Sequence, residues 1–336
     1  MMKRLLFFFL TVLILCGCSA KAPEQPSPTP PDIGQLKVHF IDVNHGDSTL
    51  VECNGEYMLV DAGEVYAGGT VLLYLAQLGV KKLDVVVSTH PHTDHMSGFA
   101  TVLPELEVGD VYRSYRAPKD EQYTNFIACL EEKHITSMIP KTGDSFTLGG
   151  ATVTVIGPVR QYADNTNNDS LVLLIRFGAT SFLLAADMEK EAEADLIARG
   201  TDLHADVLRI GHHGSETSTS KAFLEAVDPS YAVISVGRKN AHNLPDAAPL
   251  ALLRGLEIPV YRTDRMGTVV ATSDGQNITF SWEFDTCHII DNTTGLLHCP
   301  DCPLLPADAN RTYFDTKEAA MAESSVLCSR CLAPAA

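Results

Sequence analysis

Residues 88–98 read Ser-Thr-His-Pro-His-Thr-Asp-His-Met-Ser-Gly and bring three imidazoles and a carboxylate within six positions. The cluster directly follows the apolar residues 83–87, which predict a buried strand. A neutral imidazole is the commonest metal ligand, and alternate residues of an extended segment point the same way, so His90 and His92 can reach one ion. Asp94 and His95 lie just beyond and can reach a second ion. The sequence therefore predicts a metal site at the end of a strand.

The first 35 residues predict a leader and a tether. Lys3 and Arg4 precede an apolar run that is too short to span a bilayer, a pattern typical of a secretory signal over residues 1–17. Leu-Cys-Gly-Cys at residues 15–18 resembles a bacterial lipoprotein cleavage box, which implies lipid attachment to Cys18; an ordinary signal peptide is the alternative. Residues 18–35 are rich in proline and predict an extended tether. We expect a lipid-anchored protein on the extracytoplasmic face of the bacterial membrane.

From residue 36 the pattern predicts a domain of strands and helices that extends to residue 284. Residues 36–43 alternate apolar and polar, and Asn54-Gly55 predicts a tight hairpin turn. Further strands are expected at residues 57–61, 83–87, 146–156, 171–177, 181–186, 205–210 and 231–236, and helices at 69–78, 98–103, 125–133, 189–199, 220–226 and 247–254. Two mixed sheets with helices outside them, an αββα sandwich, fit this order best.

Five sequence blocks in one order resemble a known family. His90-x-His92-x-Asp94-His95 resembles the signature of the metallo-β-lactamase fold. Residues 40–48, 59–63, 183–187 and 211–215 narrow the resemblance to the extracellular hydrolase domain of the ComEC family of competence DNA-uptake proteins and its stand-alone relatives. The resemblance covers residues 36–283 and implies an α/β fold, the four-layer metallo-β-lactamase αββα sandwich, with a dinuclear metal centre.

The resemblance also assigns roles to residues of the second half. Asp187 closes an apolar strand, where an unpaired buried carboxylate would be costly, so it needs a cation; by resemblance it bridges two metals. His212 follows the strand at residues 205–210 and is the expected further ligand. His213 is a ligand, a proton donor or a residue that orients the turn. The expected metal ligands are His90, His92, Asp94, His95, Asp187 and His212, and the expected catalytic residues are Asp94 and His213.

Four polar residues are expected to support these ligands. Asp61 sits at a strand end, where it either fixes the tautomer of an imidazole or caps a helix. Residues 167–170, Asn-Asn-Asp-Ser, match a family block that stands where many other members of the superfamily carry another ligand histidine. A polar turn is the alternative for that block. The expected supporting residues are Asp42, Asp61, Asn168 and Ser170.

The chain departs from the family pattern at two places. Residues 44–46 read Asn-His-Gly where family members usually show Gly-Gln-Gly. The late His-Pro of the family aligns with Leu244-Pro245, so a histidine expected near the second metal is missing. His242 lies two residues earlier, which changes its reach by several ångströms.

The charge balance bears on the substrate. The formal net charge is −17, which does not suit generic nucleic-acid binding, although a locally basic groove remains compatible with it. Aromatic and basic residues mix at positions 112–119, where they either grip phosphates and stack bases or form an ordinary solvated edge. The expected substrate-binding residues are Arg113, Arg116, Arg238 and His242.

Five of the nine cysteines crowd the last fifty residues and predict a small module at residues 285–336. Cysteine pairs two residues apart are typical of tetrahedral zinc sites. The block resembles the small metal-binding domain of the Ada DNA-repair protein, and the ligands so implied are His298, Cys302, Cys328 and Cys331, with Cys299 as a competing ligand. Disulfide formation is the rival, because the compartment is oxidising.

These features predict a membrane-anchored metal-dependent hydrolase. We expect two divalent ions, Zn or Mn, in the hydrolase site and one structural Zn in the terminal module. The expected substrate is a phosphodiester, in DNA or another extracellular polymer, in a role related to DNA uptake. A lactonase or a β-lactamase-type amide hydrolase is the enzymatic alternative, and a catalytically weakened binding protein that keeps the fold is the other. The sequence implies no obligate protein partner.

Overall fold

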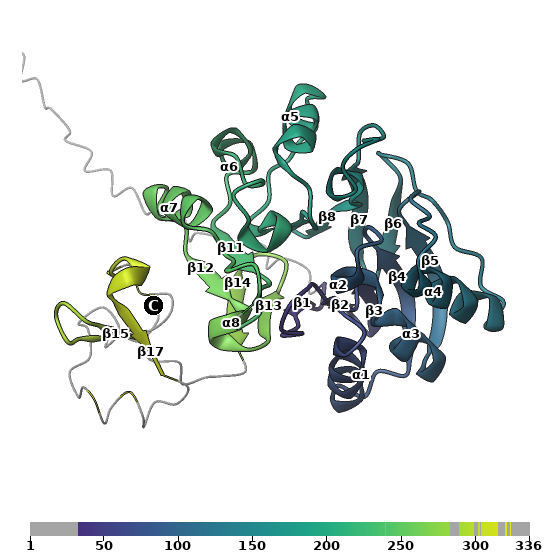
Figure 1. Ribbon diagram of the computed structural model, residues 1–336, viewed down its shortest axis with the longest axis horizontal. Coiled ribbons are helices and arrows are strands. Elements are labelled where there is room, and N and C mark those ends of the chain that lie inside the picture. The colour runs from purple at the N-terminus through teal and green to yellow at the C-terminus, as the bar shows by residue number, and fades with distance from the viewer. Residues whose placement is uncertain are drawn as a thin grey trace, which may run out of the picture. The chain divides into compact units, whose positions relative to one another are not determined.

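The computed structural model describes residues 33–238, 240–282, 289–298, 302, 304–314, 320 and 323. A seven-stranded sheet is built from the first third of the chain and a late hairpin (Figure 1). Its strands are β1 (Leu36–Phe40), β2 (Thr49–Cys53), β3 (Glu56–Val60), β4 (Lys82–Ser88), β5 (Glu107–Arg113), β13 (Val269–Ser273) and β14 (Ile278–Trp282). They lie in the order β14-β13-β1-β2-β3-β4-β5, with β3, β4 and β5 parallel.

A second seven-stranded sheet is built from the middle of the chain. Its strands are β6 (Ser145–Leu148), β7 (Ala151–Gly157), β8 (Val172–Phe177), β9 (Thr180–Leu184), β10 (Val207–Arg209), β11 (Tyr231–Ile234) and β12 (Val260–Arg262). They lie in the order β12-β11-β10-β9-β8-β7-β6, and β9 to β12 are parallel. In both sheets, parallel strands therefore end at a common edge.

The main core lies between the two sheets. In β8, Leu173 and Ile175 belong to a buried cluster that also contains Val38 of β1, whereas Val172 and Leu174 belong to a second cluster with the helices. Successive side chains of a strand point to opposite faces, so a continuous apolar run such as β8 is buried on both. The sheets are thus two inner layers.

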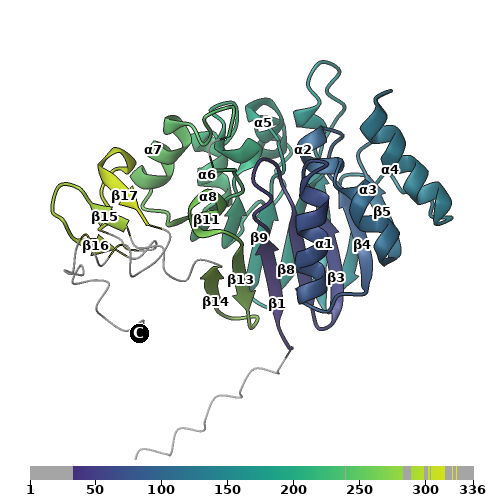
Figure 2. The same cartoon turned by 60° about the horizontal axis from the view of Figure 1, so that its bottom comes forward.

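Helices form the two outer layers (Figure 2). The first sheet is covered by α1 (Ala67–Gln77), α3 (Phe99–Val102) and α4 (Glu121–Glu132), and the second by α5 (Lys190–Ala198), α6 (Lys221–Val227) and α7 (Ala247–Gly255). The shorter helices are α2 (Thr93–Met96), α8 (Thr263–Met266), and the 3-10 turns η1 (Leu103–Glu105), η2 (Asn167–Asp169), η3 (Gly211–Gly214) and η4 (Asp308–Asn310). The predicted αββα sandwich is confirmed.

Local sequence signals explain several element boundaries. Asn54-Gly55 forms the turn between β2 and β3, as predicted. Asp120 caps α4 by accepting a hydrogen bond from the Tyr123 N–H at 2.8 Å, and Ser220 caps α6 in the same way. The single strand predicted at residues 146–156 is wrong, because Gly149 and Gly150 both adopt positive φ and turn the chain between β6 and β7.

The terminal segment contains a small sheet of β15 (Ile289–Asp291), β16 (Leu297–His298) and β17 (Arg311–Tyr313) in the order β16-β15-β17. The predicted leader, the predicted tether up to residue 32 with Cys18, and the cysteines Cys299, Cys328 and Cys331 lie outside the described residues. Across the part of the chain that is described, none of the helices has the length and apolar character needed to cross a membrane.

Candidate metal centre

The predicted metal ligands gather where strands of both sheets end. The cluster at His90 follows β4, Asp187 follows β9, and His213 lies in η3 just after β10. β9 and β10 are parallel neighbours, so their carboxyl ends meet at one edge. Ligand sites of open α/β sheets form outside such ends. The topology therefore brings together residues far apart in the sequence.

A first group of donor atoms consists of His90, His92 and Asp187, which each offer one atom within 4.8 Å of the others. His90 Nε2 lies 3.1 Å from His92 Nδ1 and 3.6 Å from Asp187 Oδ2. His90 and Asp187 are buried. These are a nitrogen and oxygen donor set of the kind that Zn²⁺ and similar ions accept.

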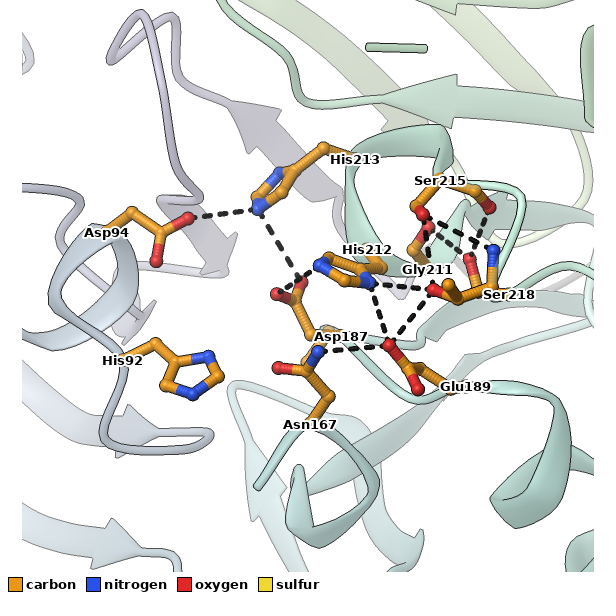
Figure 3. Close-up of polar contacts among 12 residues, drawn as sticks. His92, Asp94, Asn167, Asp187, Glu189, Gly211, His212, His213, Ser215 and Ser218 are labelled. Atoms are coloured by element: carbon orange, nitrogen blue, oxygen red, sulfur yellow. Dashed lines mark hydrogen bonds and ion pairs between the residues drawn. The ribbon is translucent and has the colours of Figure 1, made fainter. Parts of the chain in front are cut away.

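A second group consists of Asp94, His95 and His213. His213 Nε2 lies 3.2 Å from Asp94 Oδ2 and 3.6 Å from Asp187 Oδ1, and His95 Nε2 lies 3.2 Å from Asp187 Oδ2. Figure 3 shows His92, Asp94 and His213 around the space that the Asp187 carboxylate faces. Asp187 is therefore placed to serve both groups.

Several buried atoms of this centre have no hydrogen-bond partner among the described residues: His95 Nε2, His213 Nε2 and Asp187 Oδ1. Buried polar atoms are normally satisfied, and unsatisfied ones call for an unseen water or ion. All three atoms belong to the two donor groups. The residues present therefore fit a pair of divalent cations.

The carboxylates of the centre are held in the ionised form. Burial alone would raise the pKa of Asp94, but the nearby His95 and His213 outweigh it and hold that pKa well below its usual range. Burial likewise opposes ionisation of Asp187, and His95 and His213 again lower its pKa. An ionised carboxylate is the form that binds a metal.

The backbone is strained around the centre. Asp61, Ala186, His212 and His213 have φ of 58°, 47°, 49° and 53°, in the left-handed region that side-chain-bearing residues seldom adopt. Such residues cluster at functional sites, where the surrounding structure holds them. The strain in η3 turns two consecutive imidazoles toward Asp187.

Asp61 orients His95. Its Oδ2 lies 2.8 Å from His95 Nδ1, and its carboxylate also accepts hydrogen bonds from the backbone and hydroxyl of Thr89 at 2.8 and 2.6 Å. An Nδ1–H donated to Asp61 leaves the Nε2 lone pair of His95 directed at Asp187. The helix-capping alternative for Asp61 is wrong, because α1 begins at Ala67.

The two neighbouring histidines of η3 take different sides of Asp187. His213 Nδ1 lies 2.9 Å from the Ser235 carbonyl oxygen, which leaves Nε2 for the second group. His212 Nε2 lies 3.8 Å from Asp187 Oδ2, and its Nδ1 lies 3.1 Å from Glu189 Oε1. His212 thus approaches Asp187 Oδ2, the oxygen that also faces His90. His212 itself belongs to neither of the two donor groups described above.

Glu189 supports His212 as a carboxylate. Burial would raise the pKa of Glu189, but hydrogen bonds with His212, Asn167, Asn165 and Thr217 lower it to about 2. Figure 3 shows this cluster of contacts beside Asp187. A carboxylate behind a histidine is a common support of metal ligands.

The other expected supporting residues are divided between the centre and the loops. Ser170 Oγ lies 3.3 Å from His90 Nδ1 and accepts the backbone N–H of Asp187 at 3.3 Å. Asn168 Oδ1 instead accepts the Glu189 N–H at 2.9 Å and holds the loop. Asp42 accepts the Asn44 N–H at 2.9 Å within its own turn. Of the three, Ser170 touches a predicted metal ligand.

Sequence reasoning missed a buried ion pair beneath the centre. Arg209 Nη2 lies 2.7 Å from Asp47 Oδ2, and both side chains are buried. Arg209 also donates to the carbonyl oxygens of Ala186 and Ile210, and so holds the loop that carries Asp187. The sequence feature that could have indicated this ion pair is the single arginine in the apolar strand predicted at residues 205–210.

The arginines expected to bind substrate are engaged within the fold. Arg113 donates to Ser137 Oγ at 2.9 Å and to the Ser114 carbonyl oxygen at 3.0 Å. Arg116 pairs with the buried Asp169. Arg238 Nε donates to the carbonyl oxygen of Asp264 at 3.0 Å. Their role toward a substrate stays a prediction.

A cavity of about 400 Å³ adjoins the first donor group. His92 lines it together with Tyr115 and Arg116, and the remaining lining residues are Pro91, Ala117, Pro118, Asp120 and Thr166. An aromatic ring, a guanidinium and a predicted metal ligand therefore share one hollow.

His242 lies beside the centre, next to a histidine that was not expected there. The rings of His242 and His45 have centroids 5.1 Å apart, and His45 Nε2 lies 3.5 Å from Asp94 Oδ2. The expected substrate residue His242 thus lies beside His45, which faces Asp94 of the second donor group.

Comparison with known proteins identifies the family. A model of the Metallo-beta-lactamase superfamily matches residues 41–238. The chain is 30% identical over 254 residues to "ComE operon protein 3" of Bacillus subtilis and 31% identical over 260 residues to "Competence protein ComA" of Neisseria gonorrhoeae. These matches cover 69% and 77% of this chain, but 32% and 34% of the relatives, so the chain spans about a third of their length.

Among solved structures, the metallo-beta-lactamase fold protein YhfI from Bacillus subtilis matches with a TM-score of 0.48 and 12% identity over 73% of this chain and 100% of that chain. The match to the superfamily model confirms the predicted class of metal-dependent hydrolase, and the competence proteins are its relatives. The chain belongs to the metallo-beta-lactamase superfamily.

Proposed function

We propose that this chain is a membrane-anchored, extracytoplasmic phosphodiesterase that uses two divalent ions, Zn²⁺ or Mn²⁺, on DNA or another extracellular phosphodiester polymer. The observation that carries the proposal is the position of Asp187, whose Oδ2 lies 3.6 Å from His90 Nε2 and whose Oδ1 lies 3.6 Å from His213 Nε2. A carboxylate between two sets of imidazoles suits a pair of ions about 3.5 to 4 Å apart. The competence proteins among its relatives support a role related to DNA uptake.

The residues divide between two ion positions. His90, His92 and His212 would hold the first ion and Asp94, His95 and His213 the second, with Asp187 shared. Two ions held there supply Lewis acidity toward a phosphoryl or acyl oxygen and lower the pKa of water toward neutrality. Asp61, Glu189 and the Ser235 carbonyl fix the ring orientations of His95, His212 and His213.

The cavity beside His92 supports a phosphodiester substrate. Tyr115 supplies a ring on which a base can stack, and the Arg116 guanidinium lines the same hollow, although it is paired with Asp169. The net charge of −17 disfavours long-range attraction to DNA. Recognition would then rest on this hollow and on the ions.

A panel of substrates tests the proposal. The full chain, stripped with chelator and reloaded with Mn²⁺ or Zn²⁺, is assayed on single-stranded DNA, a bis-aryl phosphodiester, a phosphocholine ester and a lactone. We expect metal-dependent turnover of the first two and a loss of about 100-fold or more in Asp94→Ala. Asp84→Ala, a change of a half-buried carboxylate near the other end of β4, is the matched control.

Each outcome of the panel is informative. Turnover of the lactone without turnover of either phosphodiester would replace the proposal with the acyl hydrolase alternative. A protein that binds both ions and turns over none of the four substrates would contradict catalysis and favour a binding protein that keeps the fold.

The membrane anchor is a separate proposal and rests on Cys18. We expect the wild-type chain in the membrane fraction of a bacterial host, with a lipid mass on its N-terminal fragment. Cys18→Ser should move it to the soluble fraction of the envelope. Equal membrane retention of Cys18→Ser would contradict the lipid anchor.

A structural Zn in the terminal module is likewise proposed. His298 Nδ1 lies 3.1 Å from Cys302 Sγ, both residues are buried, and His298 Nε2 has no hydrogen-bond partner in the described segments. Burial lowers the pKa of His298, which favours the neutral imidazole that metals require. Cys328 and Cys331, or Cys299, would complete the set.

Thiol counting with metal analysis tests this site. The zinc proposal expects one zinc equivalent beyond the hydrolase ions, which Cys302→Ser removes while the hydrolase ions stay. A protein whose terminal cysteines are all oxidised and that lacks this zinc would establish the disulfide alternative instead.

A further inference from the structure

The two departures from the family pattern meet in the structure. A Cβ added to Gly237 would lie 2.7 Å from the backbone nitrogen of His45 and 2.4 Å from Asn44 Oδ1, so the two backbones are in close contact. The loop that follows Gly237 carries His242, whose ring lies beside that of His45. A change in the 44–46 turn can therefore compensate for a change in the later loop.

Leu244, at the position of the late histidine, takes no part in the centre. It packs against the apolar cluster formed by the second sheet and its helices. Asn240 fixes this arrangement, because its side chain accepts the Leu244 N–H at 2.9 Å and donates to the Leu244 carbonyl oxygen at 2.8 Å. The loop is thus closed with an apolar side chain where a donor was expected.

His45 and His213, a member of the second donor group, face the same carboxylate oxygen, Asp94 Oδ2. Its Nε2 lies 3.5 Å from Asp94 Oδ2, and His213 Nε2 lies 3.2 Å from that oxygen. Two ligands each about 2.0 to 2.2 Å from one ion, at a tetrahedral angle, lie about 3.4 Å apart. Both spacings match that expectation.

One ring nitrogen of His45 faces Asp94 and the other lies inside the fold. Nε2 faces the Asp94 carboxylate, whereas Nδ1 is buried and has no hydrogen-bond partner among the described residues. Gly46 allows the close approach, because a Cβ there would lie 2.1 Å from the Asp94 carbonyl oxygen. The turn therefore holds the Nε2 edge of His45 against the Asp94 carboxylate.

We propose that His45 is a ligand of the ion held by Asp94, His95 and His213, in place of the missing late histidine. His242, which is exposed, packs on His45 at the rim of the centre. The proposal rests on the two-ion centre proposed above and deepens it. It concerns residues in which this chain differs from the family pattern, so it is a compensation within this chain.

A compensating pair of substitutions tests the proposal. The full chain is stripped and titrated with Co²⁺, and the two dissociation constants are measured by chelator competition together with the visible ligand-field spectrum. His45→Gln, the residue that the family usually carries there, should weaken the second ion about 10- to 100-fold and change its spectrum. Adding Leu244→His to His45→Gln should restore most of that affinity.

Two further variants complete the experiment. His204→Gln, a distant and exposed change, is the control and should keep the two dissociation constants within about twofold, whereas His242→Gln tests which of the two neighbouring rings binds the ion. Unfolding of the metal-free proteins, followed by circular dichroism, shows whether the His45→Gln variant is folded. If that variant is unfolded, the single variant Leu244→His is used in its place. In the wild-type background, Leu244→His should lower the dissociation constant of the second ion.

The outcomes separate this proposal from the proposed function. Wild-type protein that binds fewer than two ions overturns both. Wild-type protein that binds two ions, with His45→Gln unchanged in affinity and spectrum, overturns the role of His45 alone. A loss in His242→Gln as large as that in His45→Gln would assign the ligand to His242 and overturn the proposal in the same way.

Discussion

His213 Nε2 lies 3.2 Å from Asp94 Oδ2, although Asp94 follows a strand of the first sheet and His213 a strand of the second. The contact joins the two inner layers of the sandwich at their common edge. An ion between these side chains would be held by both sheets at once.

The two histidines of η3 should act on different ions. His213→Ala should weaken the ion held with Asp94, and His212→Ala the ion held with His90, because the rings approach different oxygens of Asp187. We expect losses of about 10- to 100-fold in the affected dissociation constant. Stepwise Co²⁺ titration of both variants measures this. Loss of the same ion in both would contradict the division.

Asp61 should act through His95. Asp61→Asn keeps the shape of the side chain but removes the carboxylate that accepts from His95 Nδ1, so the tautomer of the ring is no longer fixed. The second ion should bind about 10- to 100-fold more weakly. Asp84→Asn makes the same change far from the centre and is the control. Unaltered metal affinity in Asp61→Asn would show that His95 is oriented by other groups.

The buried pair Asp47–Arg209 should be costly to break. Arg209→Met leaves the Asp47 carboxylate buried without its cation, and we expect a loss of about 3 to 5 kcal/mol in the free energy of unfolding. Asp47→Asn should cost a similar amount for the opposite reason. Urea denaturation of the chelator-treated proteins measures both. The double variant Asp47→Asn/Arg209→Met should lose less unfolding free energy than the two single variants lose together. A loss equal to the sum of the two single losses would contradict a direct interaction between Asp47 and Arg209.

Glu193 gives a pH dependence that is separate from the metal centre. Burial raises its pKa above the usual 4.5, although hydrogen bonds from Ser220 and Thr219 oppose the rise. The folded state therefore binds this proton more tightly than the unfolded chain does. The resulting stabilisation is fully present below about pH 4.5 and is lost as the pH rises through the folded pKa.

Comparison with Glu193→Gln measures that contribution. The difference in unfolding free energy between wild type and variant should fall with rising pH above 4.5 and then level off, because the variant has no proton to lose there. A difference that is constant from pH 4 to pH 8 would show that the pKa of Glu193 is not raised.

The fold was predictable where side-chain patterns are local. Alternation in residues 36–43 and the continuous apolar run of β8 indicate strands buried on one face or both. The missed break at Gly149 lay in two glycines inside an otherwise strand-like stretch. There, backbone conformation rather than hydrophobicity decided the structure.

Site residues that lie close together in the sequence were predictable, whereas contacts between residues far apart in the sequence were less so. His90, His92, Asp94 and His95 are visible as one cluster in the sequence. The pairing of Arg209 with Asp47 depends on how two sheets pack, which no short pattern records. The choice of sides by His212 and His213 depends on left-handed backbone conformations that their sequence does not require.

The shared carboxylate of Asp187 has a thermodynamic consequence. Because one side chain faces both donor groups, occupancy of either position changes the charge and orientation that the other position meets. If binding of the first ion changes the affinity for the second ion by some factor, binding of the second ion changes the affinity for the first ion by the same factor. Two ions bound there would therefore affect each other's binding, favourably or unfavourably, and would not load independently.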